Sequence, residues 1–280
     1  MKAASATTKH QHWVPQFYLR YFATPDTREA AMPKIWLFDK KQPDLERAPT
    51  AVRNVCGKRY LYTPLDESGN RDTSLDKYLD ELEAETAALW PVLARDCADL
   101  SEPALRNRLA RFTAYLHLRN FELFRLIDST LNLRNKLYGV PSEELLASRS
   151  AGMPDLKDAG RFFVHTVRNG ADRITKTFAE MRWTMVCSGV DVFATSDRPV
   201  TFLHETLKMP GPGKQGSVAL IPLTPRRLLA MDDRHDQPAN FYRNLDGDSR
   251  ASPFNAAIFD KAVRFVIGSK RLTDVLKRKN

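Results

Sequence analysis

The chain has 280 residues, of which 42% are hydrophobic and 28% charged, with 12 glycines and 17 prolines; this composition excludes disordered and fibrous classes. Lys and Arg outnumber Asp and Glu by 43 to 34, for a formal charge of +9, which favours encounter with polyanions such as nucleic acid. The three scattered cysteines, Cys56, Cys97 and Cys187, form no C-x-x-C motif, so they exclude a disulfide scaffold and argue against zinc bound through cysteine.

The N-terminal residues 1–9 are small and polar, and we expect a disordered tail there. They lack the apolar core of a signal peptide, and no stretch of the sequence approaches the roughly 18 apolar residues of a membrane helix. We therefore expect a cytoplasmic protein with no membrane partner. From His10 an aromatic segment leads into a short helix near Pro15. Apolar runs at 34–39 and 59–63 predict two strands that pair with each other.

Long amphipathic helices are predicted next. The first covers 74–97, with an acidic outer face and a kink at Pro91. The second begins after Pro103 and continues to about Ile127, and the two should form an antiparallel pair. Its outer face carries Arg106, Arg108 and Arg111. After a loop-rich segment at 138–154, which could be a sub-domain boundary or a mobile crossing, a third helix is predicted over 156–181.

The remaining sequence favours strands. Apolar runs predict strands at 183–187, 192–195, 217–223 and 228–231, followed by a helix at 254–262 and a last strand at 263–267. Helices that cluster between two groups of strands indicate an α+β fold with a mostly antiparallel sheet and a helical insertion. We expect a single domain over 10–280, with the helical segment at about 73–182.

Three short motifs and one asparagine are spread over the chain in a fixed order. They are His12-x-x-Pro15-x-x-Tyr18-Leu19-x-x-Phe22, Thr195-Ser196-Asp197-Arg198-Pro199-Val200, Ile221-Pro222-Leu223-Thr224-Pro225, and Asn255. With them the sequence resembles the bacterial domain of unknown function family 4238, over nearly its whole length. The common pattern of that family has Asn where Arg198 stands here. The resemblance implies no settled activity, so the chemistry has to be argued from the residues.

Two histidines near the start of the chain are candidate site residues. His10 and His12 would project to the same face of an extended segment, as two ligands of a divalent metal could, although an H-x-H pair is a weak signal. The pKa range of His12 suits acid–base catalysis. In the structural alternative, His10 lies at the edge of a disordered tail and His12 donates to the backbone.

Asp197 and Arg119 are the other principal candidates. Asp197 lies where a strand ends before Pro199, a place typical of site residues, and it could equally cap an Asx-turn. Arg119 interrupts an apolar helical stripe, so its buried charge needs an anionic ligand or, in the structural alternative, a carboxylate partner. The further substrate-binding candidates are Tyr18, Ser196 and Asn255, although Asn255 could instead cap or cross-link its helix.

Motifs that would identify other chemistries are absent from the sequence. There is no G-x-x-x-x-G-K-[ST], G-x-G-x-x-G, G-x-S-x-G or H-E-x-x-H. The charge and the candidate residues favour a nucleic-acid-directed hydrolase, a nuclease of the kind used in bacterial conflict or phage defence. His12 would be its acid or base, Asp197 would orient His12 or hold a divalent metal, and Arg119 would neutralise a phosphate. The alternative is a non-catalytic recognition protein that binds nucleic acid or a protein partner.

Overall fold

The computed structural model describes residues 10–45, 48–66, 68–140, 157–207, 210–238, 240–245 and 251–272. The predicted tail at 1–9 and most of the predicted loop at 138–154 lie outside these residues. The helices are α1 (Gln16–Arg20), the 3-10 turn η1 (Val52–Asn54), α2 (Ser74–Arg95), α3 (Pro103–Leu118), α4 (Phe121–Tyr138), α6 (Ala159–Glu180) and α7 (Ser252–Lys261).

The strands form three sheets. The first has the order β10-β5-β9-β8-β7, the second β3-β2-β11-β6, and β1 pairs with β4. Among the described strands the pairing of β10 with β5 alone is parallel, so the predicted α+β fold with mostly antiparallel sheets is confirmed. The strands are β1 (His10–His12), β2 (Lys34–Asp39), β3 (Thr50–Ala51), β4 (Gly57–Arg59), β5 (Arg182–Cys187), β6 (Thr195–Ser196), β7 (Thr201–Leu203), β8 (Val218–Thr224), β9 (Arg227–Asp232), β10 (Phe241–Asn244) and β11 (Phe265–Gly268).

The predicted pairing of the first two strands is wrong. β2 has the predicted bounds, but it pairs with β3 and β11. The second apolar run does not extend as a strand, because β4 ends at Arg59 and Tyr60 has a positive φ of 56°. That left-handed conformation breaks an extended strand. β4 instead pairs with β1 and so fixes the segment that carries both candidate histidines.

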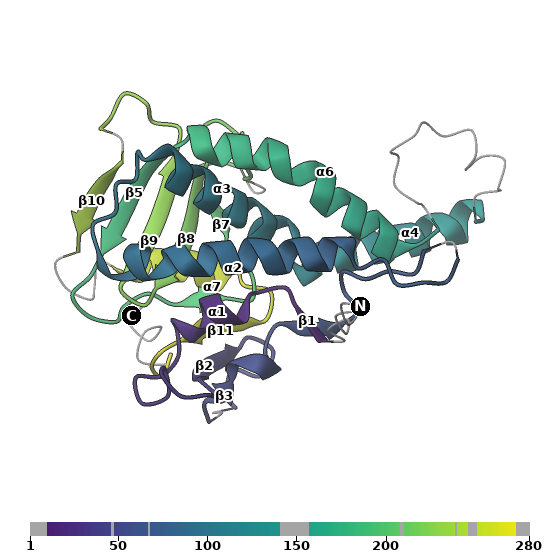
Figure 1. Ribbon diagram of the computed structural model, residues 1–280, viewed down its shortest axis with the longest axis horizontal. Helices are drawn as coiled ribbons and strands as arrows, with labels where there is room; N and C mark the ends of the chain where they lie inside the picture. The colour runs from purple at the N-terminus through teal and green to yellow at the C-terminus, as the bar shows by residue number, and fades with distance from the viewer. Residues whose placement is uncertain are drawn as a thin grey trace, which may run out of the picture.

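The helices α2, α3 and α6 form a layer against the five-stranded sheet, and α1 lies between this layer and the four-stranded sheet (Figure 1). The apolar stripe of α6 is buried, with Phe163, Val167 and Phe178 fully enclosed. Trp90 of α2 donates from Nε1 to the carbonyl oxygen of Leu223 in β8 over 3.0 Å. The apolar periodicity of the helices therefore builds the core between this layer and the five-stranded sheet.

The second predicted helix is two helices. α3 ends at Leu118 and α4 begins at Phe121, because Asn120 caps α4 by accepting the backbone N–H of Leu123 at Oδ1 over 2.8 Å. Asn is among the preferred N-cap residues, since its side chain satisfies an amide that the helix leaves unpaired. The break places Arg119 at the C-cap of α3, where its side chain can leave the helical stripe.

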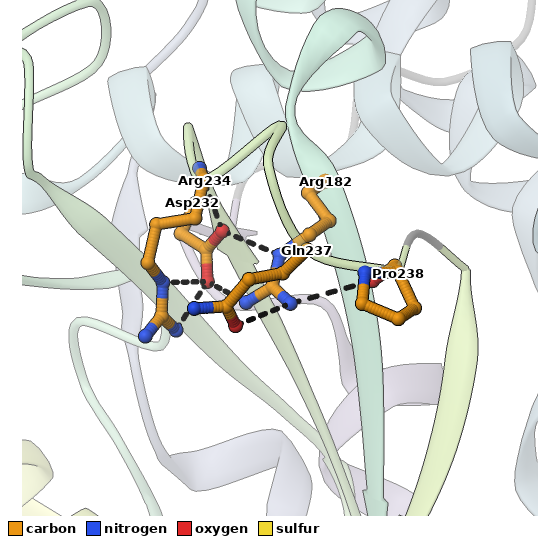
Figure 2. A network of polar contacts seen from close by, with 5 residues as sticks. All are labelled: Arg182, Asp232, Arg234, Gln237 and Pro238. Atoms are coloured by element: carbon orange, nitrogen blue, oxygen red, sulfur yellow. Dashed lines mark hydrogen bonds and ion pairs between the residues drawn. The ribbon is translucent and has the colours of Figure 1, made fainter.

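A buried ion pair joins β5 and β9 at one end of the large sheet (Figure 2). Arg182 donates from Nε and Nη2 to the two oxygens of Asp232 over 2.7 and 2.5 Å, and Arg234 adds a bond of 2.7 Å. Burial opposes ionisation of Asp232, but these hydrogen bonds outweigh it and hold its pKa well below the usual range. The pair is a structural clamp, because its donors and acceptors are satisfied within the network.

Candidate functional site

A polar cavity of about 260 Å³ lies between the start of the chain and α2. β1 brings two histidines to it, α2 brings three carboxylates, and the break after α3 brings a guanidinium. It is therefore assembled from parts of the chain that are far apart in the sequence. Its lining residues are His10, Gln11, His12, Gln16, Tyr62, Asp76, Leu79, Asp80, Glu83 and Arg119.

Arg119 is the most buried charge of this cavity, with 1% of its side chain exposed. Its Nη1 donates to Oε1 of Glu83 over 2.6 Å, which confirms the prediction of a buried, paired arginine. The Nε and Nη2 atoms are also buried, yet neither has an acceptor among the described residues. Its backbone oxygen accepts the hydroxyl of Tyr62 over 2.9 Å. Two charged donors of a residue that lines the cavity thus stay unpaired within the described part of the chain.

The carboxylates come from one face of α2, because Asp76, Asp80 and Glu83 are spaced by four and three residues. Burial raises the pKa of Asp76, with the charge of Glu83 adding to the effect and the nearby Gln11 amide opposing it. Burial also raises the pKa of Asp80, and the charges of Asp76 and Glu83 add to this shift. These groups therefore keep their protons to a higher pH than solvated aspartates do.

His12 lines the cavity, and one of its ring nitrogens carries a lone pair. Its Nε2 lies 3.0 Å from the carbonyl oxygen of Arg53; since a carbonyl can only accept, Nε2 carries the proton. Nδ1 then has the lone pair, with the amide of Gln16 at a long 3.4 Å. Burial lowers the pKa of His12, and the carbonyl of Arg53 only partly opposes this. His12 is consequently a neutral base at pH 7.

The structure gives little support to the metal site predicted weakly at His10 and His12. The two rings lie edge to face with their centroids 5.0 Å apart. No group of three His, Cys, Asp or Glu residues in the described ranges is arranged to hold a metal ion. The ring of His10 instead packs on Gly57, where an added Cβ would come within 2.1 Å of it.

The structure does not bring the Asp197 carboxylate into this cavity. Its oxygens accept the backbone N–H groups of Val263, Arg264 and Phe265 over 3.0, 2.8 and 3.0 Å. Burial raises the pKa of Asp197 while these three donors oppose the shift. The two sequence motifs do meet, because Trp13 Nε1 donates to the Asp197 carbonyl oxygen over 3.0 Å. Asp197 therefore fixes the start of β11, and its catalytic assignment loses its geometric basis.

Three further candidates are structural cross-links. The hydroxyl of the fully buried Tyr18 lies 2.6 Å from Oγ1 of Thr195 and donates to the carbonyl oxygen of Pro222 over 2.7 Å. Ser196 accepts the N–H of Arg198 in a local turn. Asn255 accepts from Ala194 N and donates to Val192 O. The hydrogen bonds of these side chains are made to the protein, and none of the three lines the cavity.

Of the three arginines predicted on the outer face of α3, only Arg108 and Arg111 are exposed. Arg106 donates to the carbonyl oxygens of Leu100 and Ala179, among other acceptors, and its guanidinium lies 4.3 Å from the ring centre of Trp183. It therefore holds α3 to the turn before β5 and is not free for phosphate.

The residues that sequence reasoning missed are the carboxylates of α2 and Gln11. The spacing of Asp76, Asp80 and Glu83 was visible as an acidic helix face, but such a face is normally solvated. The fold makes this acidic face part of a site, because β1 and Arg119 line the same cavity as the three carboxylates.

Comparisons with known proteins bear on the family of the chain. The model of the family described as "Protein of unknown function (DUF4238)" matches residues 10–271. The chain is a DUF4238 protein. Neither curated proteins nor solved structures gave a significant match. Among the described helices of this DUF4238 protein, none is long and apolar enough to cross a membrane.

Proposed function

We propose that this DUF4238 protein is a hydrolase that cleaves phosphodiester bonds of nucleic acid, with the cavity of His12, Asp76 and Arg119 as its active site. The observation that carries the proposal is the pair of free donors, Nε and Nη2, on the buried guanidinium of Arg119. Buried donors without acceptors cost free energy, so their presence in a cavity wall calls for a bound acceptor.

The chemistry of those donors favours an anionic oxygen. A guanidinium offers a planar fork that fits two oxygens of a phosphate or carboxylate. The net charge of +9 raises the local concentration of polyanions around the whole molecule. Of the anions in a cell, nucleic acid combines accessible phosphates with a bond that acid–base catalysis can hydrolyse.

The reaction needs one base and one acid. Nδ1 of His12 takes a proton from a water molecule as its oxygen bonds to phosphorus. The bond from phosphorus to the leaving oxygen then breaks, and that oxygen takes the proton of Asp76. Arg119 stabilises the charge on the non-bridging oxygens. His12 and Asp76 afterwards exchange their protons with solvent, so one water has been added across one P–O bond.

The three carboxylates of α2 oppose the approach of a phosphate when they are all ionised. Either protonation or a divalent cation removes this repulsion. The raised pKa values of Asp76 and Asp80 make protonation easier than in water. Cleavage should therefore be measured at pH 5 and at pH 7, with a chelator and with added Mg²⁺ or Mn²⁺.

The test is cleavage of labelled single-stranded RNA, single-stranded DNA and plasmid. We expect cleavage by the wild type and loss of it in His12→Ala and Arg119→Met. His235→Ala is the matched control, since His235 is exposed after β9 and does not line the cavity. No cleavage of any substrate under these conditions would overturn the hydrolase. If Arg119-dependent binding remained without cleavage, the result would support the alternative of a non-catalytic recognition protein.

A further inference from the structure

A second cavity, of about 620 Å³, is lined by five arginines and two acids. It lies where α1 and α2 end and where the strands β5 and β8 turn. The arginines are Arg20, Arg28, Arg95, Arg226 and Arg227, and the acids are Glu29 and Asp191. This concentration of guanidinium groups in one hollow is unlike the mixed charge of an ordinary solvated surface.

Protein contacts hold four of these arginines in place, and two of the four, Arg20 and Arg227, bind backbone carbonyl oxygens. Arg20 donates to the carbonyl oxygens of Arg28 and Ala30 over 3.0 and 2.9 Å. Arg227 donates to the carbonyl oxygens of Arg95 and Asp96 over 2.8 and 2.7 Å. Such bonds to neutral carbonyls orient the two guanidinium groups without cancelling their charge.

Asp191 neutralises only part of the remaining charge. Its Oδ1 accepts Arg226 Nε over 2.7 Å, and its Oδ2 lies 3.5 Å from Arg28 Nη2 and accepts the hydroxyl of Ser269. The Nε of Arg28 is buried and has no acceptor among the described residues. Buried donors without acceptors are rare in native proteins, so this one calls for an explanation.

Arg95 is the arginine of this cavity whose side chain makes no hydrogen bond to the described residues. It is the last residue of α2, and its side chain is exposed. Burial raises the pKa of the neighbouring Tyr21, and the charge of Arg95 opposes that shift. The side chain can therefore close over a bound group without breaking any contact of the fold.

We infer that this arginine cavity binds a phosphate-bearing anion, at a site separate from the proposed active site. Clustered arginines with preset forks fit the paired oxygens of a phosphate, and the excess of five arginines over two acids suits an anion with more than one negative charge. The volume lies within the range of cavities that take a small organic ligand, so a mononucleotide fits the size as well as the charge. The same phosphate chemistry occurs in a free nucleotide and in the backbone of a nucleic acid.

Calorimetric titration tests the site with pyrophosphate, adenosine diphosphate and a single-stranded oligonucleotide as probes. We expect pyrophosphate to bind the wild type, and Arg95→Glu to weaken it by about tenfold or more, because one attractive charge becomes repulsive. Arg173→Glu is the matched control, since Arg173 is exposed on α6 and does not line the cavity. Arg119→Met should leave this affinity unchanged, which separates the result from that of the proposed active site.

The pattern over the probes identifies the source of the phosphate. Tighter binding of adenosine diphosphate than of the oligonucleotide assigns a free nucleotide, and the reverse order assigns a nucleic-acid backbone. Absence of pyrophosphate binding, or equal weakening by Arg95→Glu and Arg173→Glu, would overturn the inference.

Discussion

Arg119 donates from Nη1 to Oε1 of Glu83 over 2.6 Å, while its Nε and Nη2 find no acceptor among the described residues. The ion pair therefore uses only one of the five N–H donors of the guanidinium. Glu83 is 26% exposed and Arg119 only 1%, so the pair is unsymmetrical: the carboxylate is partly open to solvent, whereas the guanidinium is buried at the cavity.

This asymmetry predicts the effect of removing the carboxylate. Glu83→Ala leaves a buried charge without a counter-ion, and we expect a loss of about 1–3 kcal/mol in the free energy of unfolding. Urea denaturation measures it. Glu85→Ala, an exposed neighbour on α2, is the control and should change stability by less than about 0.5 kcal/mol. Equal stability of the two variants would show that Glu83 does not neutralise Arg119.

The proposed acid and base predict a particular pH dependence. His12 must be neutral, and its pKa lies below its ordinary value of 6.5. Asp76 must be protonated, and its pKa lies above its ordinary 3.8. The profile of kcat/KM should therefore be a bell whose maximum is on the acid side of neutral. Asp76→Asn should remove the basic limb of the bell; a wild-type optimum above pH 7 would contradict these roles.

Asp197 is predicted to act on stability and not on catalysis. Asp197→Ala leaves the N–H groups of Val263, Arg264 and Phe265 without their acceptor, at a cost of about 3 kcal/mol or more in the free energy of unfolding. Cleavage per folded molecule should be unchanged. The two readouts are urea denaturation and cleavage normalised to the folded fraction. A fully stable variant that lost cleavage would return Asp197 to the catalytic residues.

His117 predicts an acid-sensitive fold. Its Nδ1 is buried without a partner among the described residues, and burial, with the charge of Arg198, lowers its pKa to about 4. Because the unfolded chain takes up this proton near pH 6.5 and the folded chain near pH 4, stability should fall as pH falls through that window. The loss is up to about 3 kcal/mol.

Substitution separates this histidine from the other acid-sensitive groups. In His117→Phe the decline of stability between pH 6.5 and 4 should become smaller, whereas the exposed His235→Phe should keep the wild-type slope. The comparison uses urea denaturation at several pH values. The same slope in both variants would mean that His117 is not the group responsible.

Local signals in the sequence predict the positions of several helices and strands. The bounds of β2, and the positions of α6 and β5 to within a few residues, follow from apolar periodicity, which depends on near neighbours in the chain. The break at Asn120 was missed because the apolar stripe continues through it, although Asn before Phe121 is a capping signal. The burial of Arg119 followed from the same stripe.

The site itself depended on long-range packing. The meeting of the motifs that contain His12 and Asp197 was anticipated, but the direction of each side chain was not. Nothing local shows that the Asp197 carboxylate accepts the amides at the start of β11, or that β1 lies over the acidic face of α2. The charge pattern also led to a wrong prediction. Arg106 faces outward on a helical wheel, yet its side chain is bound to the turn before β5.

The most direct test of the proposed active site measures both the stability and the cleavage rate of Arg119→Met and compares them with those of the wild type. If the free guanidinium donors exist for substrate, removing them relieves a cost of the folded state. The Glu83 carboxylate that is left is 26% exposed and can be solvated, so the variant should be as stable as the wild type within about 1 kcal/mol, or more stable. Its cleavage of labelled RNA should fall by about 100-fold or more, as for the loss of a donor that stabilises transition-state charge. A variant that loses several kcal/mol of stability, or one that cleaves at the wild-type rate, would show that Arg119 serves the fold and not the reaction.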